Sequence, residues 1–108
     1  MTASSYQRAV AEMLASRLAR LRKLTYGEAR ALPATAEEAV VLDGTTSRVT
    51  VFRQDDAYAL AGRTLITVQV ARPALLGLAS FHTERGLVFS PNEPPREATE
   101  LELRNSGG

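Results

Sequence analysis

His82 is the only histidine of this 108-residue chain, and Glu84 follows it two residues later. On an extended strand two residues at this spacing point to the same face. Arg53 and Asp55 share the same spacing near the end of another apolar stretch. One hypothesis is therefore that these four side chains meet at one end of a sheet and form the site of an enzyme or a small-ligand-binding protein.

Most kinds of catalytic site lack their required residues in this sequence. A catalytic zinc site usually has two or three nitrogen or sulfur ligands, whereas the chain has one histidine and no cysteine. Ser80 and His82 would point in parallel on one strand, which does not suit a serine nucleophile and its base. Asp55 and Asp56 are adjacent and typical of a turn. We expect no metal and no cofactor, and we interpret His82 and Glu84 as a polar strand end.

The composition is that of an ordinary globular domain, with 44% hydrophobic and 23% charged residues. The length fits one domain, which we expect over residues 1–104, with a flexible tail at 105–108. The sequence has no secretory signal and no apolar run long enough for a membrane span. The absence of cysteine gives no indication of an oxidising compartment. Together with a bias toward arginine and alanine, this favours a cytoplasmic bacterial protein.

An amphipathic helix is predicted from Thr2 or Ser4, either of which is a suitable cap, to about Leu24. Arg17 falls inside its apolar stripe, where an arginine usually lies along the surface or pairs with a carboxylate. The helix is basic, because residues 1–25 hold five basic residues and one acidic residue. The cations of interest are Arg17, Arg20, Arg22 and Lys23.

Two further short helices are indicated by capping-box patterns. Thr25 and Glu28 predict a second helix over residues 26–32, and Thr99 with Glu102 predicts one terminal turn. Between them, alternating and apolar stretches predict four strands. Their ranges are 39–42, 48–54, 63–72 and 77–83, the last resuming over 87–90 after an interruption at 84–86.

The connections between these strands are too short for crossover helices, so the sheet should be antiparallel. Residues 43–47 are rich in turn formers and longer than a two-residue hairpin loop. Pro91, Pro94 and Pro95 are expected to prevent regular structure after the fourth strand. The predicted fold is α+β, with the N-terminal amphipathic helix and the short second helix packed on one face of a four-stranded antiparallel sheet.

The second face of that sheet is neither plainly polar nor plainly apolar, as is common for partner surfaces. We expect the protein to be a non-enzymatic module that binds a protein partner or a second copy of itself through this face or through an edge strand. The residues of this predicted binding surface are Thr50, Phe52, Thr67, Gln69 and Phe81.

Nucleic-acid binding through the basic helix is a third hypothesis and the least favoured, since the net charge is only +1 and no docking motif occurs.

The terminal di-glycine after Leu103 and Arg104 is similar to the tail of ubiquitin-like modifiers. Those proteins begin with a β-hairpin and this chain is expected to begin with a helix. We interpret the ending as a tail of small residues.

Overall fold

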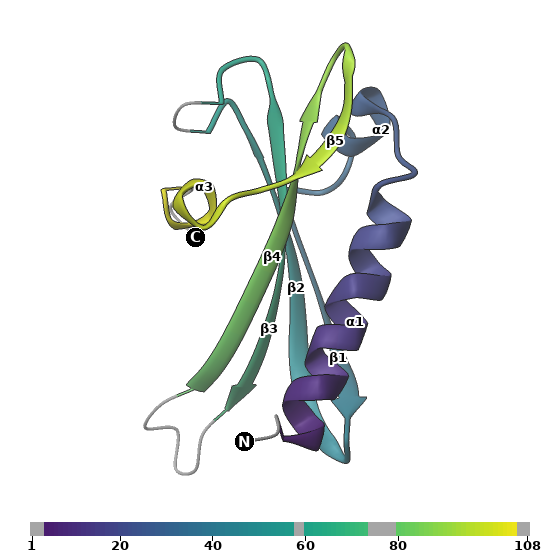
Figure 1. Cartoon of the computed structure of the whole chain (residues 1–108), viewed down its shortest axis with the longest axis vertical. Helices are drawn as coiled ribbons and strands as arrows, with labels where there is room; N and C mark the ends of the chain where they lie inside the picture. Colours follow the sequence, from purple (N-terminus) through teal and green to yellow (C-terminus); the bar gives the residue numbers. More distant parts are fainter. Residues whose placement is uncertain (1–3, 58–59, 74–79, 106–108) are drawn as a thin grey trace.

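A computed structural model describes residues 4–57, 60–73 and 80–105 of the chain (Figure 1). This part of the chain forms an α+β fold with three helices and a five-stranded antiparallel sheet, in which each strand pairs with the next one along the chain. In chain order the elements are α1 (Ser5–Leu21), α2 (Tyr26–Arg30), β1 (Thr35–Leu42), β2 (Thr45–Asp55), β3 (Thr64–Pro73), β4 (Ser80–Ser90), β5 (Glu93–Glu97) and α3 (Glu100–Arg104).

Helix α1 contributes its apolar stripe to the main hydrophobic core of the protein. It begins at a capping box in which Ser4 Oγ accepts a hydrogen bond from Gln7 N, and Gln7 Oε1 accepts one from Ser4 N. No helix in the described ranges is long and apolar enough to cross a membrane. One buried cluster joins the apolar stripe of α1 to the three inner strands, and its members include Tyr6, Val10, Leu14, Leu18, Val49, Ile66, Val68, Val70, Leu87 and Phe89.

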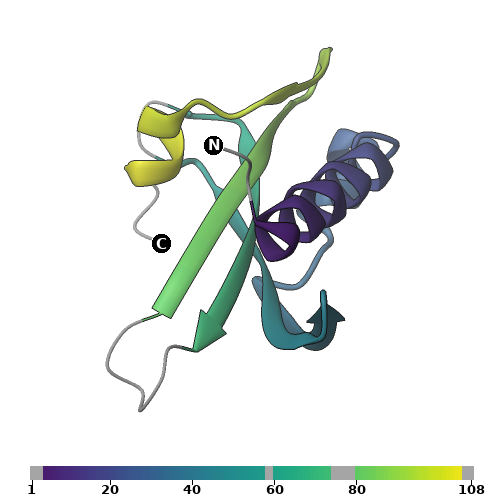
Figure 2. The same ribbon diagram turned by 60° about the horizontal axis from the view of Figure 1, so that its bottom comes forward.

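In the described part of the chain, a helix covers the opposite face of the sheet only at one end. Leu103 of α3 packs there on Leu65 and Val88, together with Ala57, Leu60 and Ala98. In Figure 2, α1 and α3 lie on opposite sides of the sheet. Among the described residues, α1 and α2 therefore cover one face of the sheet, and the single turn of α3 covers one end of the other face.

Tyr6 ties the start of α1 to the sheet. Its buried hydroxyl lies 2.8 Å from Ser47 Oγ on β2, and the guanidinium of Arg72 on β3 stacks 4.5 Å from the centroid of its ring. A buried hydroxyl needs such a partner, because an unsatisfied polar group in the core destabilises the fold. The hydrogen bond and the cation–π contact thus orient the helix across β2 and β3.

The first hairpin is tighter than the sequence suggested. Leu42 pairs directly with Thr45, so the loop has two residues, Asp43 and Gly44. Both have positive φ values, 49° and 75°. An Asp-Gly pair in this conformation matches the twist of the flanking strands, and the expectation of a longer loop was wrong because Thr45, Thr46 and Ser47 belong to β2.

Three strands differ in extent from the prediction, and one of them, β2, runs over Thr45–Asp55 instead of 48–54. β1 starts at Thr35 instead of residue 39. β4 runs unbroken across residues 84–86, where an interruption was expected; the expected residues 77–79 lie outside the described ranges. Residues 35–38 are small or charged and exposed, so they carry no alternation of apolar and polar residues. The sequence pattern therefore started β1 too late along the chain and divided β4.

Strand β5 corrects the prediction that prolines prevent regular structure after β4. Pro94 and Pro95 lie within it, and it pairs with β4 through Leu87 with Glu97 and Val88 with Arg96. Proline lacks an N–H donor and is tolerated in a strand at the edge of a sheet. A fifth strand is thus compatible with the proline-rich sequence because β5 has a neighbour on one side only.

The predicted capping boxes of the short helices are confirmed. Thr25 and Glu28 cap α2, and Thr99 and Glu102 cap α3, each through reciprocal hydrogen bonds. The helix ends differ slightly, since α1 ends at Leu21 instead of Leu24 and α2 at Arg30 instead of residue 32. Differences of this size are usual at helix ends, which fray.

Gly86 is required where α3 packs on β4. A Cβ atom at this position would lie 2.8 Å from the carbonyl oxygen of Ile66 and 3.0 Å from Leu103 Cδ2. We expect Gly86→Ala to lower the free energy of unfolding by about 1–3 kcal/mol, measured by urea denaturation. Gly27→Ala in α2 is the matched control, because its Cβ would meet only Thr25 Oγ1 at 4.0 Å. A Gly86→Ala protein as stable as the Gly27→Ala control would show that α3 does not pack as described.

Glu102 makes the stability of α3 sensitive to acid. Hydrogen bonds from the Arg96 guanidinium lower the pKa of Glu102 to about 2, with a smaller contribution from Thr99. The charged carboxylate therefore stabilises the fold above about pH 4.5, and this contribution is lost as the pH falls toward about 2. We expect Glu102→Gln to be less stable than the wild type by about 1 kcal/mol at neutral pH. In acid-denaturation experiments this difference should disappear as the pH falls toward about 2.

Candidate functional site

The sheet is incompletely covered between helix α1 and strand β1. Two adjoining pockets open there, of about 300 Å³ and 190 Å³, and Arg17 and Val51 line both. We call the two pockets together the α1–β1 groove. Its lining residues are Arg17, Arg20, Leu21, Leu24, Leu32, Ala36, Glu37, Glu38, Val49, Val51 and Val68.

The local structure explains why these residues face the groove. Arg17, Arg20 and Leu21 are three and four residues apart and so lie on one side of α1. On the sheet, Val51 pairs with Ala36 and Val68, which places all three on the face turned to α1. None of the fully buried core residues comes from β1, and Val40 and Leu42 are only partly buried. The helix therefore covers the inner strands more completely than the edge strand β1.

The charges of the groove are only partly neutralised. Arg17 forms an ion pair with Glu38 of β1 across the groove, as expected for an arginine inside an apolar stripe. The side chains of Arg20 and Glu37 form no hydrogen bond or ion pair with any residue that the structure describes. The free cation of Arg20 thus lines the larger pocket. The side chain of Glu37 lies on the sheet face turned away from α1, because Glu37 follows Ala36 along β1.

The four cations of α1 do not form a single surface. Arg17 and Arg20 line the groove. Arg22 donates a hydrogen bond of 3.3 Å to the carbonyl oxygen of Pro95 on β5, and Lys23 is exposed beyond the end of the helix. These side chains thus have different surroundings, and nucleic-acid binding through the basic helix stays a prediction.

The predicted binding surface on the second face is assembled in part. Thr50 lies opposite Gln69, and Phe52 lies opposite Thr67, so the four share one face. The two threonines are each only 6% exposed, while Phe52 and Gln69 are half-buried. Phe81 lies on β4, but its side chain is outside the described part of the structure. Binding of a partner to this face stays a prediction.

The four weak catalytic candidates do not surround one pocket. Arg53 and Asp55 lie on the α1 face near α2, where Arg53 donates a hydrogen bond to the carbonyl oxygen of Arg30. Asp55 Oδ1 accepts a hydrogen bond of 2.8 Å from Thr64 Oγ1, and Asp55 Oδ2 lies 3.8 Å from Arg30. These contacts connect α2 to β2 and β3. Arg53 Nε is buried without a partner among the described residues.

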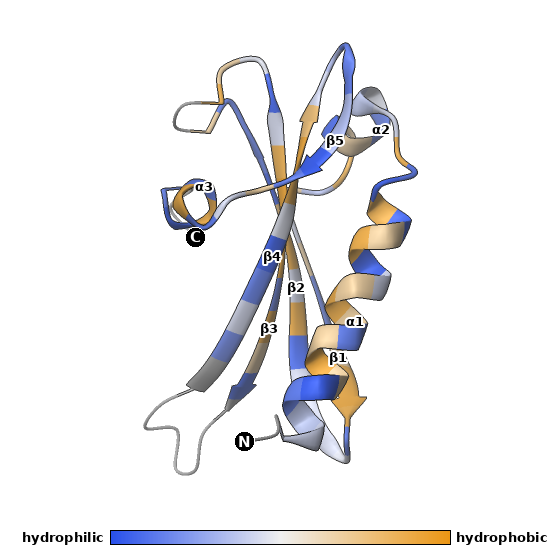
Figure 3. Cartoon of the chain, viewed as in Figure 1, coloured by the Kyte–Doolittle hydropathy of each residue, from blue (hydrophilic) through white to orange (hydrophobic). Residues whose placement is uncertain are grey.

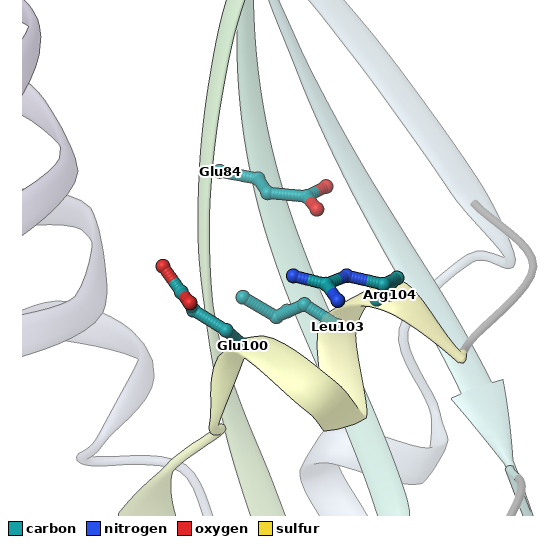
Figure 4. Close-up of a pocket in the computed structure, with 4 residues that line it drawn as sticks. All are labelled: Glu84, Glu100, Leu103 and Arg104. Atoms are coloured by element: carbon teal, nitrogen blue, oxygen red, sulfur yellow. The ribbon is translucent and has the colours of Figure 1, made fainter.

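His82 and Glu84 lie on the opposite face of the sheet. His82 is exposed, and Glu84 is half-buried and lines an open pocket of about 350 Å³ with Glu100, Leu103 and Arg104 of α3. Figure 4 shows the Glu84 carboxylate and the Arg104 guanidinium facing the same opening, with Leu103 beneath them. Within the described ranges no three His, Asp or Glu residues come together to hold a metal ion. A shared site of His82 with Arg53 and Asp55 is therefore not formed.

Comparison with known proteins adds no relative. No protein-family model matches the chain, and no curated protein or solved structure matches it. The functional argument therefore depends on the surfaces described above.

The ion pair between Arg17 and Glu38 should contribute little to folding. Both side chains are substantially exposed, at 26% and 49%, and exposed pairs are worth about 0–1 kcal/mol. We expect a double-mutant cycle with Arg17→Gln and Glu38→Gln to give a coupling free energy below about 1 kcal/mol in urea unfolding. A coupling well above this value would mean that the pair holds α1 against β1.

Proposed function

We propose that this chain is a non-enzymatic protein-binding module that accepts an extended segment of a partner protein along the free edge of β1. Addition of a strand to a sheet edge is a common mode of peptide recognition, in which main-chain hydrogen bonds give affinity and neighbouring pockets give specificity. The observation that carries the proposal is the contrast between the two edges of the sheet.

The edge formed by β5 is poorly suited to accept another strand. It has five residues, of which Pro94 and Pro95 lack an N–H donor. β1 has eight residues, no proline, and no neighbouring strand on its outer side among the described residues. Figure 3 shows an apolar C-terminal end of β1 and a mainly hydrophilic β5, and Val41 is 68% exposed. Short, proline-containing strands protect an edge, whereas long apolar ones invite pairing.

The register identifies the β1 residues that would bind the added strand. Arg53 N donates to the carbonyl oxygen of Ala34, and the same register runs to the tight turn, where Leu42 pairs with Thr45. Since hydrogen-bonded pairs alternate along an antiparallel ladder, the even-numbered residues of β1 bond to β2. The main-chain groups of the odd-numbered residues therefore point to the free edge, and these are Thr35, Glu37, Ala39 and Val41.

The charges of β1 favour a different protein over a second copy. Glu37 and Glu38 are adjacent and no basic residue lies in the strand. Antiparallel pairing of two β1 strands around Ala39 would place Glu38 of one copy diagonally across from Glu38 of the other, and like charges across a sheet are destabilising. A partner segment with a basic residue opposite Glu37 would instead neutralise a carboxylate that has no partner within the described residues.

Ala39→Pro tests the proposal. Proline removes one N–H from the free edge without removing a hydrogen bond to β2, so the fold should be retained while strand addition is lost. Ala39→Thr is the matched control, because it keeps the N–H and favours extended backbone. We expect proteins captured from the native host by the wild type to be retained by Ala39→Thr and lost with Ala39→Pro.

Amide hydrogen exchange of the complex with the purified partner gives a second measurement. Binding should slow exchange at Glu37, Ala39 and Val41, since their amides would become hydrogen-bonded. A wild-type dimer that Ala39→Pro converts to a monomer would identify the added strand as one from a second copy. Partner binding that survives Ala39→Pro, without protection of these three amides, would contradict the proposal.

A further inference from the structure

We propose that the larger pocket of the α1–β1 groove binds a medium-chain monocarboxylate, with its hydrocarbon chain in the pocket and its carboxylate at Arg20. This inference does not depend on the binding of a partner to β1. The observations that support it are the apolar walls of the pocket, the charge at its mouth and its volume.

The walls of the pocket are apolar on three sides. Leu21 comes from α1, and Leu24 and Leu32 flank α2. Val51 and Val68 of the sheet form its floor. Val68 is fully buried, whereas the other four are packed only partly against the core. Apolar surface left in contact with water in this way favours a ligand that can cover it.

The polar groups that line the pocket are two arginines. Arg17 is paired with Glu38, so its charge is largely neutralised. Arg20 lies one helical turn further along and has no hydrogen-bond or ion-pair partner within the described residues. A guanidinium presents several donors in a fixed plane that matches a carboxylate. The site therefore has one uncompensated positive charge at the rim of an apolar cavity, which selects an apolar chain with a single negative end.

The volume limits the length of that chain. A pocket of about 300 Å³ lies at the lower end of the range for ligand sites. At roughly 30 Å³ for each atom of the size of water, it accommodates about ten heavy atoms. Octanoate has this number of heavy atoms, whereas a long-chain lipid would extend beyond the larger pocket.

Titration of the ¹⁵N-labelled protein with octanoate tests the proposal. We expect saturable shifts confined to the amides of Leu21, Leu24, Leu32 and Val51, with a dissociation constant in the millimolar range or tighter. Octanol, octylamine and acetate are the comparison ligands, since each lacks either the negative charge or the chain. Each should bind at least threefold more weakly than octanoate.

Two variants separate the headgroup from the chain. Arg20→Gln removes an exposed charge and should weaken octanoate binding roughly three- to fivefold while leaving octanol unchanged. Arg8→Gln, also an exposed arginine of α1 but outside the pocket lining, is the matched control and should bind octanoate like the wild type. Val51→Phe should fill the pocket and abolish binding of both octanoate and octanol, with folding checked by circular dichroism.

Two outcomes would overturn the proposal. One is the absence of saturable shifts with octanoate at concentrations well above the millimolar range. The other is that octanol and octanoate bind with equal affinity, both to the wild type and to Arg20→Gln. The pocket would then be an apolar surface that recognises no headgroup.

Discussion

A single helix about 10 Å wide covers only about two strands of a sheet whose strands are spaced about 4.8 Å apart. The position of α1 on the sheet therefore decides which strands are buried beneath it. Tyr6, Val10, Leu14 and Leu18 of α1 are directed at the inner strands, where they join a common core with Val49, Val68 and Val70. β1 is less completely covered as a result, and the α1–β1 groove opens between it and α1. Figure 1 shows α1 running along the β1 side of the sheet.

The same limit explains the arrangement of the opposite face. One turn of helix, α3, covers Leu65 and Val88 at one end, and it fits closely because Gly86 has no side chain beneath Leu103. An ion pair between Arg85 and Glu97 connects β4 to β5. A second ion pair, between Arg96 and Glu102, connects β5 to α3. Small covers of this kind depend on specific contacts more than on buried area, because a single turn buries few apolar side chains.

The elements that the sequence predicted well are those with strong local signals. The stripe of α1, the caps at Thr25 and Thr99, and the alternation of β2 and β3 are each set by residues close together in the chain. The first half of β1 and all of β5 were missed because edge strands bear small, charged or proline residues and have little apolar periodicity. The α1–β1 groove could not be predicted either. Arg17 in the apolar stripe was its one visible sign, and its pairing with Glu38 depends on a sheet register that no local pattern encodes.

The tight turn at Asp43 and Gly44 also has an evolutionary consequence. The turn fixes which residue of β1 pairs with which residue of β2. That register decides which main-chain groups of β1 face outward. Because side chains alternate along a strand, a register displaced by one residue would exchange the two faces of β1. Val40 and Leu42 would turn away from α1, and Glu37 would turn toward it. This hairpin should therefore tolerate substitutions at its exposed positions far better than insertions or deletions, and natural variants of the chain should conserve its length more strictly than its residues.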